Sequence, residues 1–465
     1  MKKIFCFIAA IVCAGNLSAQ TFTYTDEDQW KAYEDFNAVF LDTKKYIYRD
    51  HSARQNAVDR WGGAAAIWCQ ATFYDMVVNA YRRAKAENDS VRMTKYRVLA
   101  TRIYTGEKNQ YCSFDFHNNN TNTGWFVYDD IMWWTCALAR SYETFGTAAH
   151  LSFAEKSFCR VWYGSQKVGD DGSYADPARG LGGGMFWEWQ PIEGPKPHKP
   201  GDFRSACINF PTVIAACLLH NNVPEGRTAP TGTHPTQQTK GWYLEKAIEV
   251  FNWAHTTLVQ NGRVADGIHG GGPEFNDHLY NQATYIGAAC HLYLITGERK
   301  YLNYANQAAN YVFNTMCGGS TRQYLLPLET GVEQGIYAAI FAQYLHVLVY
   351  DCGQTRYLNY VKRNIQRAWT NMDHSRGIHD GNFRGKTTEG AQIESYNASG
   401  LPALMLMFPM GDSQTGITKP NTDRATLSDV YSLEGKLIKK KASPEEVENL
   451  HKGIYIYNRH KTYVQ

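Results

Sequence analysis

The sequence lacks the motifs of several common catalytic and metal-binding sites. Its 465 residues contain no C-x-x-C pair, no H-E-x-x-H, no G-x-S-x-G and no G-x-x-x-x-G-K-S/T. These absences argue against a structural zinc site, a zinc protease, a serine hydrolase with a nucleophile elbow and a P-loop nucleotide site. The histidines show no paired metal-ligand spacing either. We therefore expect no metal ion and no organic cofactor.

A strong excess of positive charge is also missing. Lys plus Arg number 47 and Asp plus Glu number 44, which leaves a net charge of +3. This balance does not favour a nucleic-acid binder, and we expect no nucleic-acid partner. Because 44% of the residues are hydrophobic and 20% are charged, the chain has the composition of a packed globular protein.

Long apolar runs are absent beyond the N-terminus. Lys2 and Lys3 precede an apolar run over residues 4–13, and small and polar residues close it at Ala19 and Gln20. This pattern is typical of a secretory signal peptide over residues 1–20. We expect an exported protein. Its final location can be the periplasm, the cell surface or the medium, and it can be associated with the cell envelope.

Nine cysteines remain once the two in the signal segment are set aside, and an odd number cannot pair completely. Most lie in apolar helical patterns, such as Ala206-Cys207-Ile208. Small buried thiols are therefore favoured over a disulfide framework.

The apolar residues recur with helical spacing from residue 26 to about residue 408. We predict helices over residues 27–49, 63–86, 89–106, 126–145, 147–163, 203–221, 240–260, 277–296, 298–316, 331–349, 354–372 and 391–408.

A weak internal repeat supports helical hairpins. Gly297-Glu298-Arg299-Lys300-Tyr301-Leu302-Asn303-Tyr304 matches the segment from Gly353 to Tyr360, and Gly146 keeps similar spacing. A glycine in a left-handed cap can end one helix just before the next begins. Twelve helices favour an all-α (α/α)6 toroid of six hairpins over an open solenoid. We expect it to be a monomer, over residues 21–412.

Two segments interrupt the helical pattern. Residues 164–202 are rich in glycine and proline, and Phe186, Trp187 and Trp189 indicate an ordered, functional loop there. Residues 413–465 read as a linker and a small β-rich appendage, with strand patterns near Val430 and over Gly453-Ile454-Tyr455-Ile456-Tyr457.

Asp129 and Asp130 stand side by side in Tyr128-Asp129-Asp130-Ile131-Met132-Trp133-Trp134, at the start of a predicted helix. An N-cap is the plain structural explanation, but one aspartate would suffice for it. Two adjacent carboxyl groups among aromatic rings favour one ionised and one protonated form. Glycoside hydrolysis uses such a pair. The rival pair Asp170-Asp171 precedes Gly172, which favours a solvated turn.

The Asp-Asp segment, followed by Ala137-Leu138-Ala139-Arg140, resembles the signature of glycoside hydrolase family 76. The blocks that agree in order and spacing are Gly183-Gly184-Met185-Phe186-Trp187, Arg204-Ser205-Ala206-Cys207-Ile208-Asn209 and Tyr280-Asn281-Gln282. Glu333-Gln334-Gly335-Ile336 is similar to a Phe-Lys-Gly-Ile block but departs from it at the first two positions.

The resemblance implies a retaining endo-α-1,6-mannanase that acts on α-mannan or manno-oligosaccharides, with Asp129 as nucleophile and Asp130 as general acid/base. Further candidate substrate-binding residues are Trp125, Trp133, Trp134, Trp187, Asn209, Tyr280, Asn281 and Gln282. For the tryptophans, core packing is at least as good an explanation; for Asn281 and Gln282, a structural role at a helix end is the alternative.

Three other functions remain open at this stage. A transglycosylase that remodels walls would use the same two acids, because the outcome depends on whether water or a sugar enters the acceptor site. A non-catalytic glycan-binding protein would not need an intact acid pair. A different (α/α)6 enzyme, such as a glucuronyl hydrolase or a lyase, would explain the adjacent aspartates less well.

Overall fold

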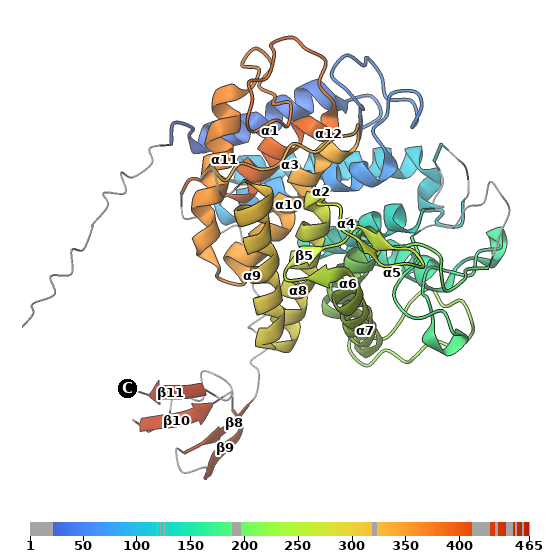
Figure 1. Ribbon diagram of the computed structural model, residues 1–465. Helices are drawn as coiled ribbons and strands as arrows, with labels where there is room; N and C mark the ends of the chain where they lie inside the picture. Colours follow the sequence, from blue (N-terminus) through green and yellow to red (C-terminus); the bar gives the residue numbers. More distant parts are fainter. Residues whose placement is uncertain are drawn as a thin grey trace, which may run out of the picture.

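Helices dominate the computed structural model, and the strands are few and short (Figure 1). The structure describes residues 22–118, 120, 122–123, 127–187, 197–318, 323–411, 428–432, 436–442, 450–451, 453–457 and 460–464. Among the helices in these ranges, none has the length and apolar character needed to cross a membrane.

The helices lie close to the predicted ranges. Their bounds are α1 Asp26–Phe40, α2 Ile67–Ala86, α3 Ser90–Gln110, α4 Tyr128–Phe145, α5 Ala148–Tyr163, α6 Ala206–Asn222, α7 Lys240–Leu258, α8 Leu279–Thr296, α9 Arg299–Tyr311, α10 Tyr337–His346, α11 Leu358–Asn371, α12 Ser395–Ala398 and α13 Gly400–Met407. The π-helical segments Val312–Met316 and Val347–Asp351 continue α9 and α10.

Three predicted helices differ from the observed ones. The helix expected over residues 331–349 begins at Tyr337, after the 3-10 turn Gln334–Ile336. The helix expected over residues 27–49 ends at Phe40, because the Asp42 carboxylate accepts the backbone N–H groups of Lys44 and Lys45 at 2.9 and 3.3 Å and forms a turn. The strands β1 (Leu41–Asp42) and β2 (Ile47–Tyr48) flank this turn.

The predicted last helix, over residues 391–408, is divided into the short α12 and α13. Pro402 lies in the first turn of α13, where it has no N–H group to offer Ala398 four residues earlier. Proline is well tolerated in a first helical turn, so a new helix can begin just before Pro402.

The glycine caps predicted from the repeat are confirmed. Gly146 ends α4 and Gly297 ends α8, both with a left-handed φ near +70°, and each donates its N–H to a carbonyl four residues earlier at 2.8 Å. Gly353 has the same φ of 70°. Side chains with a Cβ rarely adopt this conformation, which explains the glycine at these three positions.

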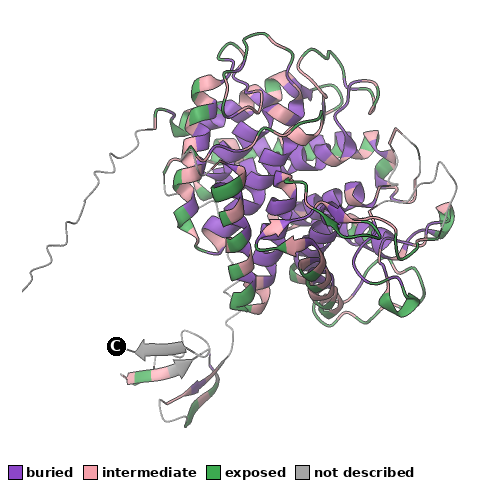
Figure 2. Ribbon diagram, viewed as in Figure 1, coloured by how far each residue is buried: buried purple, intermediate pink, exposed green. Residues whose placement is uncertain are grey.

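Contacts between the helices form a closed circuit. Hairpin partners pack as α2–α3, α4–α5, α6–α7 and α8–α9, while α2, α4, α6, α8, α10 and α13 each contact the next and α13 returns to α2. Helix α1 packs on α13 from outside this circuit (Figure 1). The circuit helices are largely buried, and exposed residues concentrate on the outer helices and loops (Figure 2).

The C-terminal segment forms a separate antiparallel sheet in the strand order β11-β10-β8-β9. Its strands are β8 Ser428–Tyr431, β9 Leu437–Ala442, β10 Gly453–Tyr457 and β11 His460–Val464. Strand β10 has the bounds predicted from the sequence. The proposed boundary at residue 412 falls next to residues outside the described ranges, so it stays a prediction.

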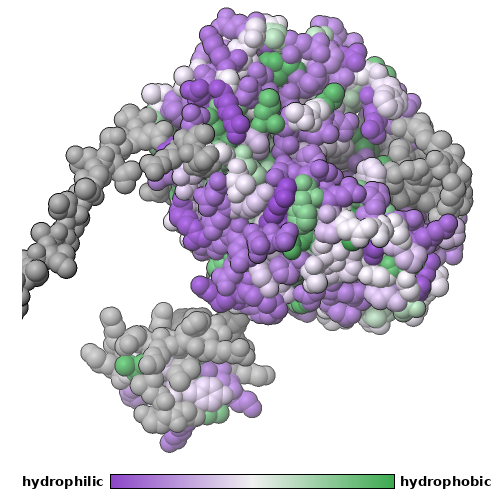
Figure 3. All heavy atoms as spheres, in the orientation of Figure 1, coloured by the Kyte–Doolittle hydropathy of each residue, from purple (hydrophilic) through white to green (hydrophobic). Residues whose placement is uncertain are grey.

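All nine described cysteines are free thiols, and eight of them are buried. This agrees with the predicted role as small core residues. On the face seen in Figure 3, the surface is mainly hydrophilic with scattered hydrophobic residues, as expected for a chain whose apolar residues occupy the core.

Candidate active site

The first turns of several circuit helices meet around the acid pair. Asp129 and Asp130 lie in the first turn of α4, and α6 contributes Cys207, α8 Tyr280 and α10 Tyr337. Helix N-termini carry a partial positive charge from their unpaired N–H groups, which favours an anion at this end of the circuit.

The simple capping explanation for the aspartates is wrong. The residue before the first turn of α4 is Val127, and no side-chain hydrogen bond caps this helix. The Oδ1 atom of Asp129 is buried without a hydrogen-bond partner among the described residues. A buried carboxyl oxygen left without a partner is costly, so side-chain capping does not explain the pair.

Burial gives the two carboxyl groups different proton affinities. Burial raises the pKa of Asp129 to about 6, and the thiol of Cys207 and the indole of Trp187 lower it in part. Burial and the neighbouring charge of Asp129 raise the pKa of Asp130 well above its ordinary value, against the opposing effect of Arg60. Burial and the repulsion between adjacent carboxylates therefore favour a pair with one ionised and one protonated carboxyl group, with the proton favoured on Asp130.

Aromatic and thiol side chains line the site on the Asp129 side. The Ser205 hydroxyl lies 2.8 Å from the Cys207 sulfur, which contacts the Asp129 carboxyl group. The rings of Tyr280 and Tyr337 stack with centroids 3.9 Å apart and an interplanar angle of 8°. Tyr280 is only partly buried, so this ring pair offers a flat surface next to Asp129.

A different set of side chains lies on the Asp130 side. Trp133 follows Asp130 by one helical turn, and its ring packs on Trp68 with centroids 5.9 Å apart. The Trp68 indole donates a hydrogen bond of 2.8 Å to the Glu333 carboxylate, and Arg60 lies 3.8 Å from the other oxygen of that group. The two aspartates thus face chemically distinct walls.

The glycine-rich loop holds Trp187 in place. Gly183 and Gly184 have φ values of 86° and 79°, and a Cβ on Gly184 would lie 2.3 Å from the Trp253 ring. Trp187 donates its backbone N–H to Phe203 at 3.0 Å. Asn209 is fully buried and exchanges hydrogen bonds of 2.9 and 3.1 Å with the backbone of Met185. Trp189, the third aromatic residue named in this loop, lies outside the described residues.

Several predicted binding residues lie in the core instead of facing the acid pair. Trp134 is fully buried, donates to the Ile67 carbonyl at 2.8 Å and stacks on Tyr74. Asn281 donates to Asp266 at 2.8 Å. Asn209, clamped on Met185, belongs with them.

Gln282 is also fully buried. In the orientation that satisfies its amide, it bridges the Gly262 carbonyl and the Val264 N–H, both at 2.8 Å. It therefore ties the start of α8 to the turn between β4 (Val259–Gln260) and β5 (Arg263–Val264). Trp125 lies outside the described residues.

The expectation of a solvated turn at Asp170-Asp171 is wrong for Asp170. Asp170 pairs with Arg160, and neither side chain is exposed. It also accepts hydrogen bonds from the Tyr128 hydroxyl and from the Gly172 N–H. Asp171 is 27% exposed and keeps the turn character.

Within the described residues, one cluster has the ligand types of a metal site. Atoms of Asp170, Asp171 and His198 lie within 4.8 Å of one another. Both carboxylate oxygens of Asp170 are already engaged, one by Tyr128 and one by Arg160. The buried guanidinium compensates the charge that would attract a cation, so the donor set fits an ion-pair network better than a metal centre.

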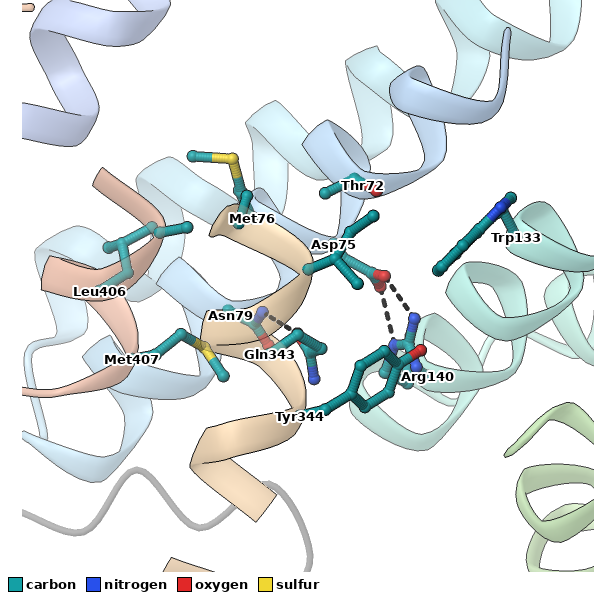
Figure 4. A pocket seen from close by; sticks show the side chains of 13 residues that line it. Thr72, Asp75, Met76, Asn79, Trp133, Arg140, Gln343, Tyr344, Leu406 and Met407 are labelled. Atoms are coloured by element: carbon teal, nitrogen blue, oxygen red, sulfur yellow. Dashed lines mark hydrogen bonds and ion pairs between the residues drawn. The ribbon is translucent and has the colours of Figure 1, made fainter. Parts of the chain in front are cut away.

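A cavity lies inside the helix circuit behind Trp133 (Figure 4). Arg140 of α4 forms a two-point ion pair with Asp75 of α2, at 3.0 and 2.5 Å. Asn79 of α2 donates to Gln343 of α10 at 2.7 Å. These contacts join three circuit helices below the acid pair and thereby brace the helix that carries it.

Four residues beside the acid pair were not recognised as site residues from the sequence: Arg60, Trp68, Cys207 and Tyr337. Glu333 was named in the sequence only as part of the block that departs from the family pattern. Local spacing carries no signal for them, because Trp68 and Glu333 are 265 positions apart. The one available hint was the departure of Glu333-Gln334 from the family block.

The sequence profile of glycosyl hydrolase family 76 matches residues 31–401. The chain belongs to this family. No curated protein sequence is significantly similar to the chain. The match to family 76 confirms the resemblance found in the Asp-Asp segment.

Solved structures share the fold of this family 76 chain. A Listeria innocua protein is 23% identical with a TM-score of 0.63, covering 82% of this chain and 96% of its own. A family 76 mannosidase from Bacteroides thetaiotaomicron is 17% identical with a TM-score of 0.63 over 82% of this chain and 96% of its own.

A third similar structure is an inactive variant of an α-1,6-mannanase from Salegentibacter sp. HEL1_6, in which two consecutive aspartates are replaced by alanine. It is in complex with α-1,6-mannotetrose. It is 20% identical with a TM-score of 0.61, covering 84% of this chain and 99% of its own.

Proposed function

We propose that this family 76 protein is a retaining endo-α-1,6-mannanase that cleaves the backbone of α-mannan. The observation that carries the proposal is the adjacent pair Asp129 and Asp130 in the first turn of α4, where burial raises both pKa values and the charge of Asp129 raises that of Asp130 further. Retaining glycoside hydrolysis needs one carboxylate and one carboxylic acid on either side of the scissile bond.

The two aspartates take different roles because their environments differ. Asp129, whose charged form is favoured by Cys207 and Trp187, attacks the anomeric carbon. Asp130, which keeps its proton, donates that proton to the leaving oxygen. Asp130 is then a carboxylate and removes a proton from water, which releases the sugar from Asp129.

The substrate assignment draws on the relatives and on the lining of the site. The Salegentibacter mannanase is inactive when two consecutive aspartates are replaced, and it binds α-1,6-mannotetrose. In this chain, the stacked rings of Tyr280 and Tyr337 and the side chain of Trp187 offer apolar surfaces beside the acid pair, whereas Trp133 is buried in the core. Such surfaces suit the C–H faces of a neutral sugar.

The architecture and location belong to the same proposal. The closed circuit of six inner helices with outer partners supports an (α/α)6 toroid of six hairpins. The basic and apolar N-terminal segment supports export, with the mature enzyme a monomer in the periplasm, on the cell surface or in the medium.

Incubation of the purified protein with linear α-1,6-mannan tests the proposal. We expect the average length of the oligosaccharides to fall with time, and the first product to keep the α anomeric configuration of the substrate. Asp130→Asn should lower kcat/KM by about 10²–10⁴-fold, and Asp129→Asn should abolish formation of the glycosyl-enzyme intermediate. Glu298→Gln is the control, because Glu298 lies past the other end of α8.

Intact polymer after incubation with the unmutated protein would refute the mannanase proposal. Binding of mannan without cleavage would point to a glycan-binding protein. Products longer than the starting oligosaccharide would identify a transglycosylase on the same two acids.

A further inference from the structure

Glu333 and Arg60 form a second pair of charged groups in the site, beside Asp130. The Trp68 indole donates a 2.8 Å hydrogen bond to one oxygen of Glu333, and the Arg60 guanidinium lies 3.8 Å from the other. The side chains of Arg60 and Glu333 are each 33% exposed. Their polar groups are therefore both fixed by neighbours and open to a ligand.

An exposed tryptophan extends this surface. Trp61 is 71% exposed, and the guanidinium of Arg60 lies 5.4 Å from the centroid of its ring. Large aromatic side chains normally bury most of their area. The Trp61 indole instead lies in solvent, in contact with the Arg60 cation, which is unusual for a residue that only packs. It is suited to stack on a ligand.

We propose that Arg60, Trp61, Trp68 and Glu333 form a sugar-binding subsite for the unit on the leaving-group side of the scissile bond. This inference rests on the proposed function and adds to it a specificity site outside the two catalytic aspartates.

The charges of the subsite indicate a neutral sugar. A carboxylate offers hydrogen-bond acceptors, and the planar guanidinium group offers hydrogen-bond donors. Together they can bind neighbouring hydroxyl groups of a hexose, which both donate and accept. Because the charges of Glu333 and Arg60 compensate each other, the subsite has no net attraction for a phosphate or an amino group. Trp61 supplies the apolar platform for the C–H face of the ring.

The position next to Asp130 selects the leaving-group side. In a retaining mechanism the nucleophile and the acid stand on opposite sides of the anomeric carbon, and the acid touches the leaving oxygen. Arg60 and Glu333 act electrostatically on Asp130, whereas Cys207 and Trp187 contact Asp129. A sugar bound by Arg60 and Glu333 therefore lies beyond the leaving oxygen.

Two substrates with the same glycosyl portion separate this role from a general effect on catalysis. One is linear α-1,6-mannohexaose, whose leaving group is a sugar, and the other is a nitrophenyl α-1,6-mannotrioside, whose leaving group is not. For Glu333→Gln we expect the ratio of kcat/KM, hexaose over nitrophenyl, to fall about tenfold, as for loss of one hydrogen bond to a charged group. For Trp61→Ala, which removes the stacking platform, we expect the same ratio to fall by up to about tenfold. Glu298→Gln should leave the ratio unchanged.

Each outcome decides the matter. An unchanged ratio in both variants, with activity on both substrates, overturns the subsite and leaves the proposed function standing. If the unmutated protein cleaves neither substrate, the proposed function fails and the subsite fails with it. Preferred cleavage of mannan carrying phosphate or amino groups overturns the assignment to a neutral sugar. Trp61 is exposed, so Trp61→Ala tests the subsite even if Glu333→Gln does not fold.

Discussion

The hydroxyl group of Tyr128 donates a hydrogen bond to the buried carboxylate of Asp170. Tyr128 directly precedes the acid pair, and Asp170 is also paired with Arg160. The first turn of α4 is thus held by a buried ion pair, in which Arg160 comes from the end of α5 and Asp170 from the loop that follows.

Asp170→Asn should destabilise the protein by about 3–5 kcal/mol, because it leaves the Arg160 guanidinium buried without its counter-charge. Chemical denaturation measures this change. Asp171→Asn is the matched control: its carboxylate is 27% exposed, so a loss of no more than about 1 kcal/mol is expected. Equal effects of the two substitutions would show that Asp170 does not have a buried structural role.

Asp130→Asn should make the protein more stable at alkaline pH. The pKa of Asp130 is raised in the folded state, so the folded protein binds more protons than the unfolded chain, and stability falls as pH rises above the unfolded pKa. An amide mimics the protonated acid and removes this loss. We expect the Tm of the variant to exceed that of the unmutated protein by at least about 2 °C at pH 8 and to match it near pH 4. A Tm difference independent of pH would contradict the raised pKa.

Cys207→Ala should move the acidic limb of the pH–activity profile to higher pH. The thiol stabilises the charged form of Asp129, whose pKa is about 6. Without the thiol, the effect of burial is less compensated and the pKa of Asp129 rises further. Activity requires ionised Asp129, so the rate should begin to rise at a higher pH. Cys207→Ser keeps a donor and should keep the limb in place. A uniform loss of activity at every pH in both variants would mean that Cys207 only fills space.

Gly184→Ala should lower both stability and activity by displacing the loop that carries Trp187. The substitution places a Cβ 2.3 Å from the Trp253 ring at a φ of 79°. The close contact should destabilise the fold by about 1–3 kcal/mol, in addition to the cost of a left-handed backbone for alanine. Gly180→Ala has a φ of 74° with no atom within 4 Å of the new Cβ, and it isolates the conformational cost. Thermal unfolding and mannan hydrolysis of both variants check this difference.

The local pattern of the sequence was enough for most of the secondary structure. Helical spacing predicted the helices from α2 to α11, most of them within a few residues, because a face that packs on the core repeats every 3.6 residues. Gly146 and Gly297 marked helix ends for a local reason, the left-handed cap. The pattern failed at Asp42, where the side-chain carboxylate accepts a backbone hydrogen bond and ends the helix in a turn.

The candidate site divides in the same way. The sequence by itself determined the acid pair, because two adjacent aspartates at a helix start among aromatic residues are a local feature. Only the tertiary structure decided that Asn209 and Gln282 serve the backbone of neighbouring loops, that Asp170 is buried against Arg160, and that Glu333 stands beside Asp130. The reason is physical: a residue's spacing reports which face of its own helix it occupies, whereas its charge state and partners depend on segments that folding brings from hundreds of positions away.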